Sequence, residues 1–396
     1  MKAMNHPRIV LRKGREAALR RGHPWVFSGA LARVEGEPVP GQVVLAVDAG
    51  GKPLGLGFYN RGNIAFRLLT EDPTAKIDGG FWRRRIARAV SLRQQVIPAG
   101  TNAYRLINAE GDGMPGLVCD RYGGYLVYSI GTAGMEQWRG TLTDLLSELL
   151  EPAGIYERSG GSSRSQEGLS ERIGLVAGEI PPMVTILENG LRFEVDLLTG
   201  QKTGFFLDQR GNREMVGALS RGTTVLNCFS YTGAFSVYAG RGGARRVVSV
   251  EASAEANQIA CRNLSRNGLL AENHPVLTAN CFEYLRETEE TFDRIILDPP
   301  AFAKSRGDIA RALRGYREIN LRAARRLTEG GMLATFSCSN PIDETMFTKM
   351  VLGAVRDAGK TAQLLFTLGA GPDHLVNLAH PEGRYLKGLL LCVGAE

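Results

Sequence analysis

From about residue 191, the chain alternates regularly between short β-prone runs and helical segments. The predicted strands are 225–229, 247–251, 276–279, 293–297 and 332–337, the predicted helices are 233–240, 253–267, 309–327 and 343–358, and two late runs are 362–368 and 385–393. Strands that alternate with helices form βαβ units, which place parallel strands in one sheet covered by helices. We therefore predict a Rossmann-like, doubly wound, mostly parallel seven-stranded sheet.

Ligands of such sheets bind beyond the carboxyl ends of the strands. The loop 227–233 follows the first strand and holds one glycine, Gly233, where dinucleotide sites use GxGxxG. This argues against a nicotinamide- or flavin-dependent oxidoreductase and favours a cofactor without phosphates, such as S-adenosylmethionine, with a plain βα turn as the alternative. Glu251 ends the next strand 18 residues later, where a carboxylate can accept both ribose hydroxyls of an adenosine.

Two further strand ends carry candidate catalytic groups. Asp298 begins Asp-Pro-Pro, and an acid there can hold the edge of a base flipped out of its stack. There are two alternatives. In one, Asp298 serves only to form a turn; in the other, the protein is a methyltransferase of amino groups, in which the comparable loop starts with Asn-Pro-Pro. Cys338 follows 40 residues later between two serines, where its thiol can act as a nucleophile. We predict that the other five cysteines are structural: Cys119, Cys228, Cys261, Cys281 and Cys392.

The first half of the chain lacks this alternation. Short β-prone runs in residues 8–70 are separated by Gly, Pro and Asp, which predicts a small β-rich module. Residues 81–95 predict an amphipathic helix with its arginines in solvent, 136–150 a second helix, and 159–170 a mobile loop. We predict three domains, 1–73, 74–190 and 191–396, the second a small α+β domain.

Composition limits the class of protein further. Of the 396 residues, 43% are hydrophobic and 22% charged, which is typical of a soluble globular chain. No apolar run is long enough to cross a bilayer and the N-terminus lacks the apolar stretch of a secretory signal, so we expect a cytoplasmic protein with reduced thiols and no membrane partner. Six Cys and five His show no ligand spacing, so no metal is expected.

Positive charge is concentrated in residues 1–25, 83–93 and 304–326, within a net charge of +7. Such clusters are typical of a nucleic-acid partner, because neutralised phosphates release counterions, although solvated helix faces are the alternative. Trp25 and Phe27 could stack on bases, but we expect core packing for both. The candidate phosphate contacts are Arg12, Lys13, Arg15, Arg20, Arg21, Lys304, Arg306 and Arg314.

Over its whole length the chain resembles the RlmI-like ribosomal RNA large subunit cytosine-5 methyltransferase family. The stretches that carry the resemblance are His23–Phe27, Lys202–Arg210 (KTGFFLDQR, the most specific), Asn227–Gly233, Asp298–Phe302, Gly315–Tyr316 and Ser337–Ser339. The resemblance implies an N-terminal PUA β-barrel that binds RNA, a central domain and a C-terminal class I S-adenosylmethionine-dependent methyltransferase domain. It implies a cofactor pocket formed by Gln209, Arg210, Asn227, Phe229, Tyr231, Gly233, Glu251, Asn280 and Asp298.

One position departs from the family pattern. The family usually has Asp where this chain has Asn280, and that Asp receives the adenine amino group; the amide oxygen of Asn can still accept it. The implied reaction is the formation of 5-methylcytosine in 23S ribosomal RNA, in which Cys338 adds to cytosine C6 and Asp298 donates to N3. A related guanine-methylating branch shares Asp-Pro-Pro but lacks the cysteine, so Cys338 favours cytosine.

Two other readings of the sequence stay open. They are a methyltransferase acting on guanine in RNA and a non-catalytic RNA-binding ribosome-assembly factor. The target nucleotide and the oligomeric state, with a homodimer as one option, are not determined by the sequence.

Overall fold

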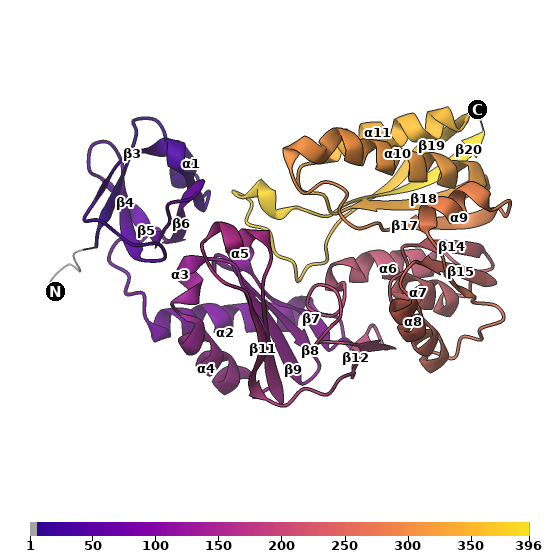
Figure 1. Ribbon diagram of the computed structural model, residues 1–396, viewed down its shortest axis with the longest axis horizontal. Helices are drawn as coiled ribbons and strands as arrows, with labels where there is room; N and C mark the ends of the chain where they lie inside the picture. The colour runs from indigo at the N-terminus through magenta and orange to yellow at the C-terminus, as the bar shows by residue number, and fades with distance from the viewer. Residues whose placement is uncertain (1–5, 396) are drawn as a thin grey trace. The chain divides into compact units, whose positions relative to one another are not determined.

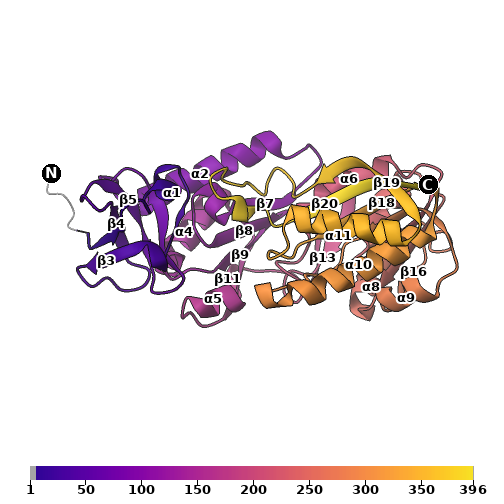
Figure 2. The ribbon, with the colours of Figure 1, turned by 90° about the horizontal axis from the view of Figure 1, so that it is seen from above.

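The computed structural model describes residues 6–395, which form two compact units, each assembled from several stretches of chain (Figures 1 and 2). Unit 1 contains the chain up to Val184 together with Asp196–Phe205 and Pro372–Gly383. Unit 2 contains Thr185–Val195, Phe206–Gly371 and the chain from Arg384 onward. Within the described residues, no helix combines the length and the apolar character that crossing a membrane requires.

The first sheet of unit 1 has six strands in the order β2-β6-β5-β4-β1-β3. Residues that alternate along its strands, such as Ile9 and Leu11 or Val44 and Ala46, form one buried core. Helix α1 (Ala17–Arg20) lies between β1 and β2 in the chain, and β2 and β3 are short strands of three and five residues. The elements are β1 (Arg8–Leu11), β2 (Trp25–Phe27), η1 (Ser28–Ala30), β3 (Leu31–Glu35), β4 (Val43–Val47), β5 (Pro53–Tyr59) and β6 (Ile64–Thr70).

The second sheet of unit 1 has five strands in the order β11-β10-β9-β8-β7. Helices α2 and α4 cover it through Trp82, Ile86 and Leu142. The single helix predicted over 136–150 is two helices, because the chain leaves helical geometry at Trp138, whose ring lies 5.6 Å from that of Trp82. The elements are α2 (Gly79–Val96), β7 (Ala103–Asn108), η2 (Ala109–Asp112), β8 (Leu117–Tyr122), β9 (Tyr125–Ile130), α3 (Ala133–Glu136), α4 (Arg139–Leu150), β10 (Gly154–Ser159), α5 (Ser162–Gln166) and β11 (Arg172–Gly178).

The arginines of α2 are not all in solvent, which corrects the prediction for this helix. Arg93 is buried and donates to both carboxylate oxygens of Asp112, at 2.6 and 2.8 Å. Arg85 is partly buried, donates to the carbonyls of Gly113 and Leu69, and has its pKa lowered to about 10 by burial. Arg83 pairs with Glu148. Two of the five arginines, Arg85 and Arg93, therefore make internal contacts, whereas Arg84 and Arg88 are exposed.

The stretch 159–170 was predicted to be a mobile loop, and that prediction is wrong. It forms α5, from which Arg164 is buried and donates to the carbonyl of Ile130 and to Glu136, both at 2.8 Å. This buried guanidinium also donates to the carbonyl of Ser170, so it joins the Ser- and Gly-rich segment to β9 and α3.

Residues 372–383 are the last part of unit 1 and reach it from the far end of the chain. The buried side chain of Asp373 accepts the backbone N–H of Arg105 at 2.9 Å, and its carbonyl accepts Arg93 at 2.7 Å. The His380 ring lies 4.3 Å from that of Trp25. This segment includes η5 (Pro381–Gly383).

Unit 2 contains the predicted sheet of seven strands, in the order β16-β15-β14-β17-β18-β20-β19. Its strands are parallel from β16 to β18, and β20 is antiparallel to both β18 and β19. Its strands are β14 (Thr224–Cys228), β15 (Arg246–Glu251), β16 (Val276–Thr278), β17 (Phe292–Leu297), β18 (Leu327–Ser337), β19 (Lys360–Leu368) and β20 (Lys387–Ala395); its helices are η3 (Leu207–Gln209), α6 (Arg210–Ala218), α7 (Ala234–Arg241), α8 (Ala254–Arg266), α9 (Cys281–Glu287), η4 (Arg306–Asp308), α10 (Ile309–Arg326) and α11 (Glu344–Asp357); β12 (Val184–Glu188) and β13 (Leu191–Val195) form a separate two-stranded sheet.

Alternating strand residues divide the core of unit 2 between the two faces of the sheet. Leu226 packs in one cluster with residues of α9, α10 and α11, whereas its neighbour Val225 packs in another with residues of α6 and α7. Helices α10 and α11 lie side by side in both ribbon views. Helix α8 begins as predicted, with the Ser253 hydroxyl accepting the N–H of Ala256 at 3.1 Å.

Candidate active site

The loop between β14 and α7 turns tightly at the carboxyl end of the sheet. Phe229, Tyr231 and Gly233 have φ values of 59°, 47° and 76°, a region that L side chains rarely adopt. Three buried polar atoms of this loop have no hydrogen-bond partner among the described residues: Asn227 Oδ1, Ser230 Oγ and Thr232 Oγ1. Strained backbone and unsatisfied buried polar atoms are features of binding sites, so this loop fits the predicted cofactor cradle.

Glu251 ends β15 beside this loop and its carboxylate is held in place from both sides. Oε2 accepts the backbone N–H of Tyr231 and Oε1 that of Ser253, each at 3.0 Å. Each carboxylate oxygen has a further acceptor site, so the group can receive two hydroxyls from a ribose.

Asn280 and Cys281 follow β16. The amide oxygen of Asn280 accepts the N–H of Phe282 at 2.9 Å, so Asn280 is the N-cap of α9, and it is exposed. The thiol of Cys281 accepts the N–H of Phe229 at 3.0 Å and lies 3.3 Å from the carbonyl of Val250. Cys281 was predicted to be structural, and it is buried and holds the backbone of the loop 227–233.

Asp298 and Cys338 follow neighbouring parallel strands, β17 and β18, which pair through Leu297 and Thr335. Ser339 connects the two loops, because its hydroxyl accepts the N–H of Ala303 at 3.1 Å and lies 3.0 Å from the hydroxyl of Tyr316. Asp298 and Cys338 are both partly exposed. The two predicted catalytic groups therefore flank one region at the carboxyl edge of the sheet.

The Gly315–Tyr316 pair holds the Asp298 loop from α10. The Tyr316 ring lies 4.5 Å from that of Phe302, and a Cβ at Gly315 would lie 3.3 Å from the same ring. Burial raises the pKa of Tyr316, so its hydroxyl stays protonated near neutral pH and can donate.

The KTGFFLDQR run is where the chain leaves unit 1 and enters unit 2. In unit 1, the Thr203 hydroxyl donates to Asp120 at 2.6 Å. In unit 2, the Phe206 ring packs edge-on against Tyr231 of the cofactor loop, with 5.2 Å between the ring centroids. Gln209 and Arg210 are buried on the following turn. Phe206 was not among the predicted site residues, although it lies within the most specific run.

The predicted phosphate contacts of unit 1 are exposed. Arg12, Lys13, Arg15 and Arg21 are open to solvent, and Arg20 pairs with Asp48 at 2.5 Å. The packing prediction for two aromatic residues needs correction. Phe27 is 49% exposed, while Trp25 is partly buried and donates its indole N–H to Glu110 at 2.8 Å.

The predicted phosphate contacts of unit 2 are also exposed. Lys304 and Arg306 lie in the loop after Asp298, and Arg314 lies on α10. Two of the cysteines that we predicted to be structural are not buried: Cys261 on α8 is exposed, and Cys392 on β20 is partly exposed. Across residues 6–395 no group of three or more His, Cys, Asp or Glu side chains is arranged to hold a metal ion.

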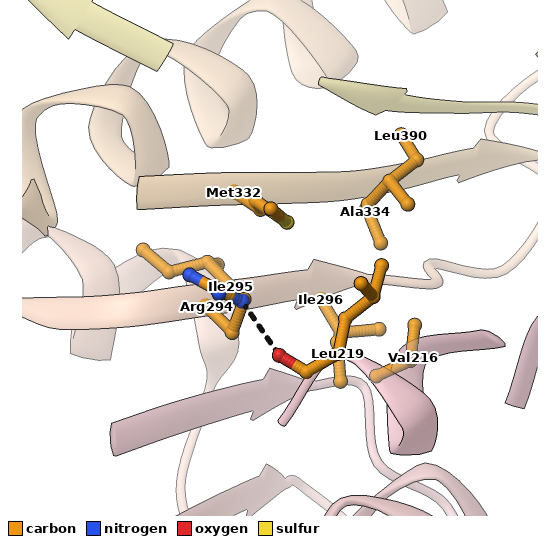
Figure 3. Close-up of a pocket in the computed structure, with 8 residues that line it drawn as sticks. All are labelled: Val216, Leu219, Arg294, Ile295, Ile296, Met332, Ala334 and Leu390. Carbon is orange, nitrogen blue, oxygen red and sulfur yellow. Dashed lines mark hydrogen bonds between the residues drawn. The ribbon is translucent and has the colours of Figure 1, made fainter. Parts of the chain in front are cut away.

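A small apolar pocket lies between α6 and the strands β17, β18 and β20 (Figure 3). Its lining includes Val216, Ile296, Met332 and Leu390, and the Arg294 guanidinium donates to the Leu219 carbonyl at 3.1 Å at its edge. These strand residues precede Asp298 and Cys338, so the pocket lies under the middle of the sheet and not at its carboxyl edge.

Comparisons with known proteins agree with this architecture. The PUA-like domain family matches residues 9–71, and the S-adenosylmethionine-dependent methyltransferase family matches residues 170–359. A solved protein from Streptococcus mutans that is assigned to the S-adenosylmethionine-dependent methyltransferases has a TM-score of 0.83 at 25% identity and covers 97% of this chain and 99% of its own. A second solved structure, described as a methyltransferase in complex with S-adenosylhomocysteine, has a TM-score of 0.84 with the same identity and coverage.

The fold and the cofactor loop define the class: this is a multi-domain α/β protein with an N-terminal PUA-like domain and an S-adenosylmethionine-dependent methyltransferase domain. The ribosomal RNA large subunit methyltransferase I of Shewanella amazonensis is 43% identical over 389 residues, which cover 97% of this chain and 98% of that protein. The corresponding protein of Aeromonas salmonicida is 44% identical with the same coverage. The chain belongs to the ribosomal RNA large subunit methyltransferase I family.

Proposed function

We propose that this protein transfers the methyl group of S-adenosylmethionine to C5 of a cytosine in 23S ribosomal RNA, through a covalent adduct between Cys338 and cytosine C6. The observation that carries the proposal is the pairing of β17 with β18, which brings an acid and a thiol to adjacent strand ends joined through Ser339. Relatives of 43–44% identity are named as large-subunit ribosomal RNA methyltransferases, which supports the substrate.

The chemistry needs both groups. Cytosine C5 is a poor nucleophile, so the Cys338 thiolate first adds to C6, and the electron pair of the C5–C6 double bond moves toward C5. Protonated Asp298 donates a hydrogen bond to N3 and stabilises the developing charge. C5 then forms a bond with the methyl carbon of S-adenosylmethionine, whose sulfur leaves as the thioether. Transfer of the C5 proton to water restores the double bond and expels the thiolate.

The cofactor is held by the strand-end loops in this proposal. Glu251 accepts the ribose hydroxyls, and the amide oxygen of Asn280 accepts the adenine amino group alongside the cap bond that it already receives. The loop residues Phe229, Tyr231 and Gly233 shape the wall of the pocket. The remaining contributors are Gln209, Arg210, Asn227 and Asp298.

RNA binding is proposed for the exposed cations. In unit 1 these cations lie in the PUA-like domain, where Phe27 on β2 is also exposed. In unit 2, Lys304 and Arg306 follow the Asp298 loop and Arg314 lies on α10. The proposed contacts are Arg12, Lys13, Arg15, Arg20, Arg21, Lys304, Arg306 and Arg314. We also propose domain limits near residues 73 and 190 for the PUA-like, central and methyltransferase parts.

The test is transfer of a labelled methyl group to unmethylated 23S ribosomal RNA, followed by identification of the nucleoside by mass spectrometry. The wild type should form 5-methylcytosine. Cys338→Ala should lose about 10³-fold or more in rate, as removal of a nucleophile does, while it still binds S-adenosylmethionine. Cys261→Ala is the matched control, because this thiol is exposed on α8, and it should retain full activity.

Three outcomes would contradict the proposal. Methylated guanosine as the product would assign a different base. Cofactor binding without transfer to RNA would indicate a non-catalytic role. A Cys338→Ser variant that methylates at the wild-type rate would remove the covalent adduct from the mechanism.

A further inference from the structure

Lys387 lies beside the Cys338 loop although it is 49 residues away in the chain. It is the first residue of β20, which runs antiparallel to β18, and it pairs with Ser337, the residue immediately before Cys338. The backbone of Lys387 is therefore fixed opposite the end of the strand from which the thiol projects.

The side chain of Lys387 contacts the residue on the other side of Cys338. Its Nζ donates to the carbonyl of Ser339 at 2.8 Å, and the residue is only 8% exposed. The same lysine thus meets both neighbours of Cys338, one through its backbone and one through its amine. The Ser339 hydroxyl is in turn held by Ala303 and Tyr316, so this loop is fixed on two sides.

A buried ammonium is costly unless nearby groups stabilise its charge. Burial lowers the pKa of Lys387, while negative charge on Cys338 and on Asp343 raises it. Asp343 caps α11 by accepting the N–H of Met346. Tyr316 of α10 also meets this loop, because its hydroxyl lies 3.0 Å from that of Ser339 and burial raises its pKa, and Asp298 follows the neighbouring strand β17.

The attraction between Lys387 and Cys338 is reciprocal. If a negative charge on the sulfur favours the ammonium, the ammonium favours the thiolate by the same free energy. A cation beside a partly exposed cysteine is the arrangement that produces reactive thiolates. Cys119, in contrast, is fully buried and its pKa is raised by burial, so it stays an inert thiol.

We propose that Lys387 is a positioning residue for the reaction proposed above: its ammonium fixes the Cys338 loop through the Ser339 carbonyl and stabilises the Cys338 thiolate that adds to the base. In this step the thiol releases its proton to solvent, Lys387 keeps its own, and the sulfur retains the electron pair that forms the bond to C6. The inference rests on the proposed function, but its consequence for the thiol can be measured without RNA.

The experiment measures alkylation of the full-length protein by iodoacetamide as a function of pH, with each cysteine followed by peptide mass spectrometry. In the wild type, the pH midpoint for Cys338 should lie below that for Cys261, the exposed thiol that serves as an internal reference. In Lys387→Met the Cys338 midpoint should rise by about one pH unit or more, a tenfold loss of thiolate, whereas Cys261 should not change. Lys387→Arg, which keeps the charge, should stay close to the wild type.

Methyl transfer supplies a second readout. The activity of Lys387→Met should be low at neutral pH and recover as the pH rises and the thiol ionises unaided, whereas a purely structural defect would not recover. The inference is overturned if the pH midpoint for alkylation of Cys338 in the wild type lies at or above that of Cys261, and this result does not require the Lys387→Met variant to fold. It is also overturned if Cys338 has the same alkylation profile in Lys387→Met as in the wild type. If the wild type forms no 5-methylcytosine but its Cys338 still has an alkylation midpoint below that of Cys261, only the proposed function is refuted.

Discussion

The Glu188–Arg213 pair gives a sharp prediction for the stability of unit 2. Both side chains are buried, and Arg213 donates to the two carboxylate oxygens at 2.8 and 2.7 Å. Burial is the largest single influence and lowers the pKa of Arg213, but the charge and hydrogen bonding of Glu188, together with Tyr238 and Asp208, outweigh it, so the pKa is raised. Arg213 also donates to the carbonyl of Phe206 at 2.9 Å, and the Phe206 ring packs against Tyr231 of the loop 227–233.

Replacement of Glu188 by Leu leaves a buried guanidinium without its counter-charge. Removal of one partner of a buried pair costs about 3–5 kcal/mol. With an m-value of about 2 kcal/mol/M in urea, the unfolding midpoint of unit 2 should fall by about 1.5–2.5 M. The double variant Glu188→Leu/Arg213→Met should recover most of the loss, because replacement of both charges by apolar groups is close to neutral.

The assay must report on unit 2. All three tryptophans, Trp25, Trp82 and Trp138, belong to unit 1, so their fluorescence follows that unit instead. Amide hydrogen exchange of β14 and β15 at increasing urea concentration follows unit 2 directly.

The matched control is Glu290→Leu, which breaks the exposed Arg246–Glu290 pair of the same unit and should cost less than about 1 kcal/mol. The reasoning is refuted if Glu188→Leu shifts the midpoint no more than Glu290→Leu does, or if the double variant is as unstable as the single one.

Two further predictions concern ligand binding. Gly233→Ala should weaken S-adenosylmethionine binding in calorimetry and cost about 1–2 kcal/mol of stability, because φ is +76° and the new Cβ would lie 3.0 Å from that of Ala260. The control is Gly222→Ala, which has φ of +70° but open space around it and should leave binding unchanged. Equal affinities of the two variants for S-adenosylmethionine would contradict the prediction. Phe27→Ala should weaken binding of a 23S ribosomal RNA fragment by about 1–3 kcal/mol in a filter-binding assay, without changing the salt dependence of binding. The control is Val39→Ala, which changes a residue that is 56% exposed and should leave RNA binding unchanged. A changed salt dependence would show that Phe27 does not act by stacking on a base.

The parts of the fold that the sequence predicted well are those with strong local signals. Strands of the parallel sheet are buried on both faces, so they form apolar runs separated by amphipathic helices. The start of the helix at about residue 253 and the strand-end positions of Glu251, Asp298 and Cys338 follow from that pattern. These positions locate the candidate site without knowledge of any long-range contact.

The features that were missed depend on partners far away in the chain. Periodicity placed Arg93 with the exposed arginines of α2, but Asp112 and the carbonyl of Asp373 bury it. Lys387 has no motif of its own, and it reaches Ser339 only because β20 folds back antiparallel to β18. Phe27 was expected in a core because it is aromatic, but its strand is too short to show which face is covered.

The way the chain passes back and forth between the two units has a consequence for biosynthesis. Residues 372–383 belong to unit 1, where Asp373 accepts hydrogen bonds from Arg93 and from the backbone of Arg105. A ribosome must therefore have made the chain as far as residue 383 before all the parts of the unit that began first are present. We expect the nascent first half to remain dependent on the last segment, so that neither unit can be excised as one continuous stretch and expressed alone.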